Sequence, residues 1–143
     1  MEEKEVAVEA PFVDTSFWFA LASSKDSHHS RAVELLRASQ GRPLATSNFV
    51  LSETITLIRA RKGHALAVAF GNQLQRDGRI RIHRITEEDE REAWRLFQRH
   101  NTQEFSFVDC TSFAVMHRLS VRQALSFDGD FSWMGFGLPG EGD

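Results

Sequence analysis

The chain contains a single cysteine, Cys110, among its 143 residues. An internal disulfide needs a second cysteine, and so does a cysteine-based zinc site, so both are excluded. Long hydrophobic runs are also missing, because runs such as 17–22 and 65–70 fall far short of the roughly 20 residues that a membrane-spanning helix needs. The acidic first ten residues lack the basic start and apolar centre of a secretory signal. We therefore expect a cytoplasmic protein without a membrane span.

An excess of positive charge is missing as well. The formal net charge is −3 at pH 7 and the isoelectric point is near 6.1, which argues against a protein that holds nucleic acid by a bulk positive field. Only three of the 17 basic residues are Lys, and the others are Arg. The planar guanidinium suits bidentate phosphate contacts, but a general preference for Arg explains this bias equally well.

The composition that remains is that of an ordinary globular protein, with 41% hydrophobic and 26% charged residues. A chain of 143 residues can build one hydrophobic core but not two independent ones. We therefore expect a single domain over residues 1–143, with a folded core over about residues 10–136 and flexible ends. The acidic N-terminus and the Gly/Pro-rich segment 135–143 are those ends.

Short apolar segments alternate with amphipathic ones along the chain. Thr86 and Asp89 have the spacing of a capping box, which predicts a helix start. Strands that alternate with helices indicate an α/β domain with a mainly parallel sheet. The segments typical of strands are 10–14, 44–46, 79–83 and 123–127, and the helical patterns cover 30–39, 48–58, 64–75, 87–97 and 113–119.

Acidic residues recur at the ends of these predicted elements. Asp14 closes the first strand and Asp128 closes the last one. Glu53 lies early in the helix after the second strand, and Asp109 lies just before a later helical pattern. In open parallel sheets, ligands bind beyond the carboxyl ends of the strands. We therefore expect the four carboxylates to share one pocket at that edge of the sheet.

A shared pocket of carboxylates points to a metal site. Neighbouring carboxylates repel each other, and a divalent cation removes the cost of that repulsion. Oxygen ligands without a nearby His or Cys favour Mg²⁺ or Mn²⁺, which bind phosphate oxygens directly. Each acid alone is weak evidence, because Asp at a helix start is usually a cap and Glu on a helix usually faces solvent. Their shared placement is what predicts phosphodiester chemistry.

Four short motifs contain these acids, and they are FVDTS at 12–16, TSNFVLSE at 46–53, FSFVDCTSF at 105–113 and SFDGDF at 126–131. With these motifs in this order, the chain resembles a PIN domain over nearly its whole length, and within that family the VapC-type toxin ribonucleases of prokaryotic toxin–antitoxin pairs. The resemblance implies a three-layer PIN-like fold and Mg²⁺-dependent endoribonuclease activity. It also implies that Asp14 and Asp109 ligate the metal, with Glu53 and Asp128 completing the acidic set.

The same resemblance implies partners. RNA is the implied substrate, and a small cognate antitoxin protein is implied to block the acidic pocket. The resemblance and the aromatic content together predict a homodimer.

Two further side chains are candidates for the site. Asp130 offers a second carboxylate two residues after Asp128. Because Asp128 directly ends the predicted strand and Phe131 is expected to pack inward, we expect Asp128 inside the pocket and Asp130 at its rim. Ser16 either hydrogen-bonds a carboxylate or a metal-bound water, or caps the following helix. Asn48 has the same two alternatives.

Several other residues are given structural roles. His28 and His29 are adjacent in a polar loop, which does not direct two imidazoles at one ion, so we expect surface residues. Segment 17–19 and the region of Trp133 could stack RNA bases, but core or dimer contacts are the expected role of so many large rings. His117 is expected to pack on a helix.

Two other functions fit parts of the pattern. A non-catalytic PIN-fold protein that binds RNA or a protein partner is the main alternative, and the full acidic set counts against it. A phosphate-sensing α/β domain of the receiver kind is the second. That domain requires a Lys after the last core strands, and none of the three Lys residues lies there.

Overall fold

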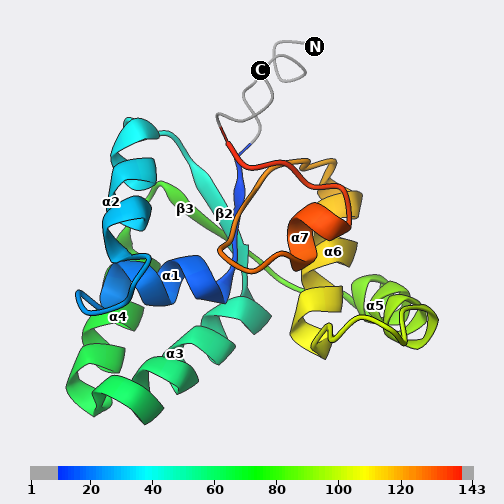
Figure 1. The fold of residues 1–143 in the computed structure, drawn as a ribbon, viewed down its shortest axis with the longest axis horizontal. Coiled ribbons are helices and arrows are strands. Elements are labelled where there is room, and N and C mark those ends of the chain that lie inside the picture. The colour runs from blue at the N-terminus through cyan, green and yellow to red at the C-terminus, as the bar shows by residue number, and fades with distance from the viewer. Residues whose placement is uncertain (1–9, 140–143) are drawn as a thin grey trace.

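The computed structural model describes residues 10–139 (Figure 1). Within this range, four strands form a parallel sheet in the order β3-β2-β1-β4. Phe12 of β1 pairs with Ala45 of β2 on one side and with Ala124 of β4 on the other. The strands are β1 (Phe12–Val13), β2 (Leu44–Ser47), β3 (Ile80–His83) and β4 (Ala124–Leu125).

Seven helices of the described range cover the sheet, and Figure 1 shows α1 to α4 on one side of the strands and α5 to α7 on the other. This arrangement confirms the predicted three-layer α/β fold. No helix among residues 10–139 is long and apolar enough to cross a membrane. The helices are α1 (Thr15–Ala22), α2 (His29–Ala38), α3 (Asn48–Lys62), α4 (His64–Arg76), α5 (Glu87–Arg99), α6 (Phe107–Leu119) and α7 (Asp130–Trp133).

The two central strands are buried on both faces. Phe12 and Val13 of β1 have no exposed surface, and all four residues of β2 are buried. Strands covered by helices on both faces consist of apolar or small residues without alternation. The edge strand β3 is partly exposed and keeps the alternation of the sequence. The core therefore extends through the sheet into the helix layers on either side.

Helices α1 and α3 begin where strands β1 and β2 end, because a polar residue caps each first turn. Asp14 follows β1 and accepts a hydrogen bond from the backbone N–H of Ser16 at 3.4 Å. Ser47 ends β2 and its hydroxyl accepts one from the N–H of Val50 at 3.0 Å. Such acceptors satisfy donors that a first helical turn leaves free. Both helix starts thus lie at the carboxyl edge of the sheet.

Capping boxes start α5 and α6. The box formed by Thr86 and Asp89 confirms the prediction from the sequence. In the second box, the Ser106 hydroxyl accepts from the Asp109 N–H at 2.9 Å, and the Asp109 carboxylate accepts from the Ser106 N–H at 3.0 Å. Asp109 therefore lies inside the first turn of α6. The helix begins earlier than the pattern at 113–119 suggested, because Ser106 is its cap.

Helix α1 is not among the elements predicted from the sequence. Phe17, Trp18 and Ala20 are between 0% and 3% exposed, so the helix has almost no polar face and no amphipathic period. These rings belong to the core, as expected. The His29 imidazole Nδ1 lies 2.7 Å from the carbonyl oxygen of Ala20 and thereby joins the start of α2 to α1.

Strand β4 is shorter than predicted. The chain leaves the sheet after Leu125 because the Ser126 hydroxyl turns to the carboxylate of Asp14, to which it donates a hydrogen bond at 3.0 Å. Asp128 therefore lies in the loop between β4 and α7, and not directly at the strand end as predicted.

The C-terminal segment is ordered up to and just beyond residue 136, where the folded core was expected to end. Phe136 is 7% exposed and joins the core. The N–H of Gly137 donates to the carbonyl of Arg122 at 2.9 Å, and the N–H of Ala124 donates to the carbonyl of Gly137 at 2.8 Å. Gly137 thus pairs beside β4. The other residues predicted to be flexible, 1–9 and 140–143, lie outside the described residues.

Candidate active site

Asp14 is the buried acid at the carboxyl end of β1. It is 2% exposed, and its Oδ2 atom accepts hydrogen bonds from the hydroxyls of Ser16 and Ser126 at 3.1 and 3.0 Å. Burial raises the pKa of Asp14 to about 6 and the carboxylate of Asp128 adds to the rise, while the hydrogen bonds oppose it. Asp14 is therefore held in one orientation, and it keeps its proton to a higher pH than an exposed carboxyl does.

Ser16 connects Asp14 to the loop that follows β4. Its hydroxyl donates to Asp14 and accepts from the backbone N–H of Phe127 at 2.8 Å. Asp14 itself is the N-cap of α1. Of the two roles considered for Ser16, the structure shows the contact with a carboxylate.

Asp109 faces the same place from α6. It is 9% exposed, and its Oδ2 atom is engaged by the Ser106 N–H. Burial raises the pKa of Asp109 to about 7, the Ser106 hydrogen bond opposes the rise, and the carboxylates of Asp14, Asp128 and Asp130 add to it. The electrostatic coupling places Asp109 among these acids.

Three of the acids form a close group, which we name the carboxylate cluster. Asp109, Asp128 and Asp130 each offer a carboxylate oxygen, and these oxygens lie within 4.8 Å of one another. The Asp130 N–H donates to Asp128 Oδ1 at 3.0 Å, which folds the loop so that both carboxylates stay near α6. Neither His28 nor His29 belongs to the cluster.

The expected order of Asp128 and Asp130 is reversed. Asp128 is exposed and Asp130 is half-buried. Phe131 does pack inward, with 2% of its surface exposed, and it draws the adjacent Asp130 toward α6. Burial raises the pKa of Asp130, and the carboxylates of Asp128 and Glu104 raise it further. Both acids contribute to the cluster, with Asp128 on its open side.

Glu53 is held beside this group rather than within it. Its carboxylate accepts a hydrogen bond from the hydroxyl of Thr15 at 2.6 Å, and Thr15 in turn lies 3.0 Å from the hydroxyl of Thr54. Since Thr15 directly follows Asp14, this bond fixes half-buried Glu53 near the end of β1. Thr15 was not among the site residues predicted from the sequence. Its place directly after Asp14, as the first residue of α1, was the available signal.

Asn48 has a structural role. Its side-chain oxygen accepts from the N–H of Ile85 at 2.9 Å and fastens the segment before α5 to the start of α3. His117 is exposed, with its ring centroid 5.4 Å from that of Phe136, so it covers the core as expected.

The donor set of the site fits a hard divalent cation. Asp109, Asp128 and Asp130 bring carboxylate oxygens within 4.8 Å of one another, and Asp14, directly after β1, interacts electrostatically with Asp109 and Asp128. The groups that shift the pKa values of Asp14, Asp109 and Asp130 are carboxylates, hydroxyls and backbone amides. Buried carboxylates whose pKa values are raised by one another gain most from a bound cation.

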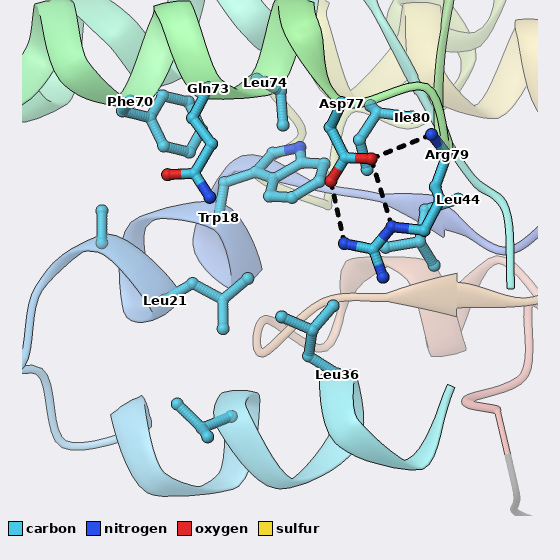
Figure 2. A pocket seen from close by; sticks show the side chains of 12 residues that line it. Trp18, Leu21, Leu36, Leu44, Phe70, Gln73, Leu74, Asp77, Arg79 and Ile80 are labelled. Atoms are coloured by element: carbon cyan, nitrogen blue, oxygen red, sulfur yellow. Dashed lines mark hydrogen bonds and ion pairs between the residues drawn. The ribbon is translucent and has the colours of Figure 1, made fainter. Parts of the chain in front are cut away.

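A separate apolar pocket lies on the other side of α1 and contains none of these acids. Figure 2 shows it between α1, α2 and α4, with Trp18 and Phe70 on its wall. Its volume is about 330 Å³. The ion pair of Asp77 and Arg79, with an oxygen–nitrogen distance of 2.8 Å, lies at one end. Its lining is chiefly apolar, so it offers no comparable group of metal ligands.

The sequence profile described as "PIN domain" matches residues 12–137. The chain belongs to the PIN domain family. The chain is 46% identical over 125 residues to the 23S rRNA-specific endonuclease VapC20 of Mycobacterium tuberculosis, covering 87% of this chain and 94% of that protein. It is 32% identical over 127 residues to a VapC ribonuclease of Archaeoglobus fulgidus, covering 86% and 80%.

A solved structure is similar to this PIN domain. The crystal structure of Mycobacterium tuberculosis VapC20, described as a sarcin-ricin loop cleaving toxin, superposes with a TM-score of 0.83 at 44% sequence identity. The match covers 89% of this chain and 96% of that one. These comparisons confirm the predicted family, its VapC-type branch and the α/β fold.

Proposed function

We propose that this PIN domain cleaves RNA phosphodiester bonds as a VapC-type endoribonuclease, with the carboxylate cluster and Asp14 as its active centre. The observation that supports this centre is the convergence of four acids from three distant segments. Oxygens of Asp109, Asp128 and Asp130 lie within 4.8 Å of one another, and Asp14 interacts electrostatically with two of them.

Each acid has a distinct role in the proposal. Asp14 and Asp109 hold the metal, because they are the most buried acids of the site and each is fixed by hydrogen bonds. Asp128 and Glu53 hold a second ion or orient the attacking water, and Asp130 supports Asp128. The proposed ion is Mg²⁺, with Mn²⁺ as its substitute. When bound, it polarises the scissile phosphate and lowers the pKa of the attacking water.

The test is the conservative replacement of each proposed ligand. Asp14→Asn and Asp109→Asn keep the side-chain volume but lose the ligand charge, so we expect Mg²⁺-dependent RNA cleavage to be abolished while the circular dichroism spectrum is kept. Glu90→Gln on the exposed face of α5 is the matched control. Cleavage at the wild-type rate in both Asn variants would rule out this active centre.

The substrate proposal follows the relatives. One relative, VapC20 of Mycobacterium tuberculosis, is named as a 23S rRNA-specific endonuclease and its structure is described as that of a sarcin-ricin loop cleaving toxin. This supports an exposed loop of ribosomal RNA as the substrate of this chain. Primer extension on total RNA after expression of the wild type and of Asp109→Asn maps the cleavage site. Cleavage only outside ribosomal RNA contradicts the substrate class but not the activity.

A homodimer and a cognate antitoxin protein complete the proposal. The dimer is supported by an apolar surface on α5, which carries Trp94 and Phe97 at 54% and 42% exposure. The antitoxin is supported by the resemblance to VapC-type toxins. We expect the product of a neighbouring small gene to inhibit cleavage at a one-to-one ratio, measured as RNA cleavage in a titration.

A further inference from the structure

Trp133 is an exposed ring whose orientation is fixed. It ends α7 and is 53% exposed, although Phe131 two residues earlier is 2% exposed. Its ring centroid lies 5.4 Å from that of His100 and 5.7 Å from that of Phe105, with interplanar angles of 85° and 65°. Such edge contacts hold an aromatic ring in place. The indole is therefore positioned and still open to solvent.

A network of buried rings supports this arrangement. The centroid of Phe105 lies 5.1 Å from that of Phe113, which lies 5.0 Å from that of Phe131. Phe105, Phe113 and Phe131 are all between 0% and 5% exposed. Trp133 is thus attached to a rigid part of the core, and an aromatic group that meets it does not have to order it first.

Trp133 is a neighbour of the carboxylate cluster. It lies three residues after Asp130 in the single turn of α7, and its backbone N–H donates to the carbonyl of Gly129 at 2.9 Å. Side chains three residues apart lie on the same side of a helical turn. Glu104, from the loop that carries Phe105, acts electrostatically on Asp130. The loop, the indole and the acids therefore meet at one place.

The charge of the protein explains why an aromatic contact is needed there. The net charge is −3 and the centre itself is a group of acids, so a bulk positive field does not hold RNA against it. Stacking of a base on an aromatic ring does not depend on charge, and every base has a π face.

We propose that Trp133 is a stacking platform for an unpaired RNA base next to the phosphodiester that the carboxylate cluster cleaves. The proposal rests on the active centre proposed above. It replaces the expectation from the sequence that the region of Trp133 serves core or dimer contacts. The ligand is a single-stranded nucleotide, because a paired base cannot leave its own stack to lie on the indole.

The experiment combines a protein variant with a substrate variant. An oligoribonucleotide with a mapped cleavage site is compared with two versions that carry an abasic ribose on either side of the cleaved bond. On the intact RNA, Trp133→Ala should raise KM about 5- to 150-fold, the range expected for one base–aromatic stack, with kcat unchanged. Trp133→Phe should keep part of the affinity. Val68→Ala, which truncates an exposed apolar side chain on α4, should leave KM unchanged.

The abasic substrates decide the matter. On the substrate that lacks the stacked base, the KM of the wild type should rise about as much as Trp133→Ala raises it on intact RNA. Trp133→Ala should raise the KM for that substrate no further. An unchanged KM for Trp133→Ala on intact RNA, or an equal loss on intact and on both abasic substrates, would overturn the platform. Asp109→Asn in the same assay reports separately on the active centre. If that variant is inactive while Trp133→Ala is normal, only the platform fails.

Discussion

Asp128 and Asp130 are the residues whose relative importance is most sharply testable. Asp130 is the less exposed, but Asp128 acts electrostatically on both Asp14 and Asp109. We therefore predict that Asp128→Ala lowers the cleavage rate under saturating Mg²⁺ more than Asp130→Ala does, by about 10- to 100-fold against wild type. Single-turnover cleavage of one oligoribonucleotide measures both. A larger loss in Asp130→Ala would make Asp130 the working acid.

Thr15 is a positioning residue for Glu53. Its hydroxyl donates to the Glu53 carboxylate at 2.6 Å, and loss of such an outer contact typically costs about 10- to 100-fold in metal affinity or activity. We predict a loss in this range for Thr15→Val in a Mn²⁺ titration of the cleavage rate, with rescue in Thr15→Ser, which keeps the hydroxyl. If Thr15→Val and Thr15→Ser behave alike, the hydrogen bond has no role in the site.

Helix α5 carries the surface proposed for the dimer. Trp94 and Phe97 stack with centroids 5.8 Å apart, and Phe107 of α6 meets both edge-on. The first turn of α5 is acidic and its last turn carries Arg99. Two copies of α5 packed antiparallel bring opposite charges together at both ends.

A charge in the middle of this surface tests that pairing. We predict that Trp94→Glu raises the dimer dissociation constant by about 30-fold or more, the effect of losing a central interface residue. Sedimentation velocity over a concentration series measures it. Lys25→Glu, on an exposed residue of the loop between α1 and α2, is the control. A monomeric wild type, or a Trp94→Glu variant with unchanged sedimentation, would contradict the prediction.

A helix or strand could be predicted from the sequence where residues close together in the chain determine it. The Thr86 capping box was visible because its two residues form it alone. Helix α1 was not predicted, because Phe17, Trp18 and Ala20 are all buried and leave no polar period. The length of β4 was missed because Ser126 leaves the sheet for Asp14, which is 112 residues away in the sequence.

The stability of the whole protein should depend on pH through the same acids. In the folded protein the pKa values of Asp14 and Asp109 are raised from 3.8 to about 6 and about 7. The folded state therefore binds protons more tightly than the unfolded state, so stability of the metal-free protein falls as pH rises from about 4 to about 7. Below and above this window these two groups add no further slope.

A bound metal ion and the substitution Asp109→Asn should each reduce this loss of stability at higher pH. With EDTA present, we predict that Asp109→Asn raises the free energy of unfolding at pH 8 by on the order of 1 kcal/mol and flattens its dependence on pH. Mg²⁺ at about 100 times its Kd should stabilise the wild type by about 2.7 kcal/mol, but much less at pH 5, where protons occupy the ligands. Urea unfolding at several pH values measures each effect. A metal-free wild type that gains stability from pH 4 to 7 would contradict the assignment.

The acids could be predicted to converge from the sequence only where the pairing of parallel strands brings them together. Asp14 and the loop of Asp128 meet because β1 and β4 are neighbours in a parallel sheet, which the alternation of strands and helices suggested. The contact of Ser16 with a carboxylate was one of the two roles considered from the sequence. The hydroxyls of Thr15 and Ser126, which also orient carboxylates, were not predicted in these roles. Their partners are set by the tertiary packing of segments far apart in the chain.

The pairing of Gly137 beside β4 has a consequence for protein engineering. Phe12 N–H donates to the Gln123 carbonyl, and Gln123 also bridges to Gly137, so the two ends of the described chain leave the sheet at the same end (Figure 1). The carboxylate cluster lies at the other end of the strands. A circular permutant that joins these ends through a short linker, and opens the chain in the exposed turn at 40–42, should therefore keep an intact cleavage centre.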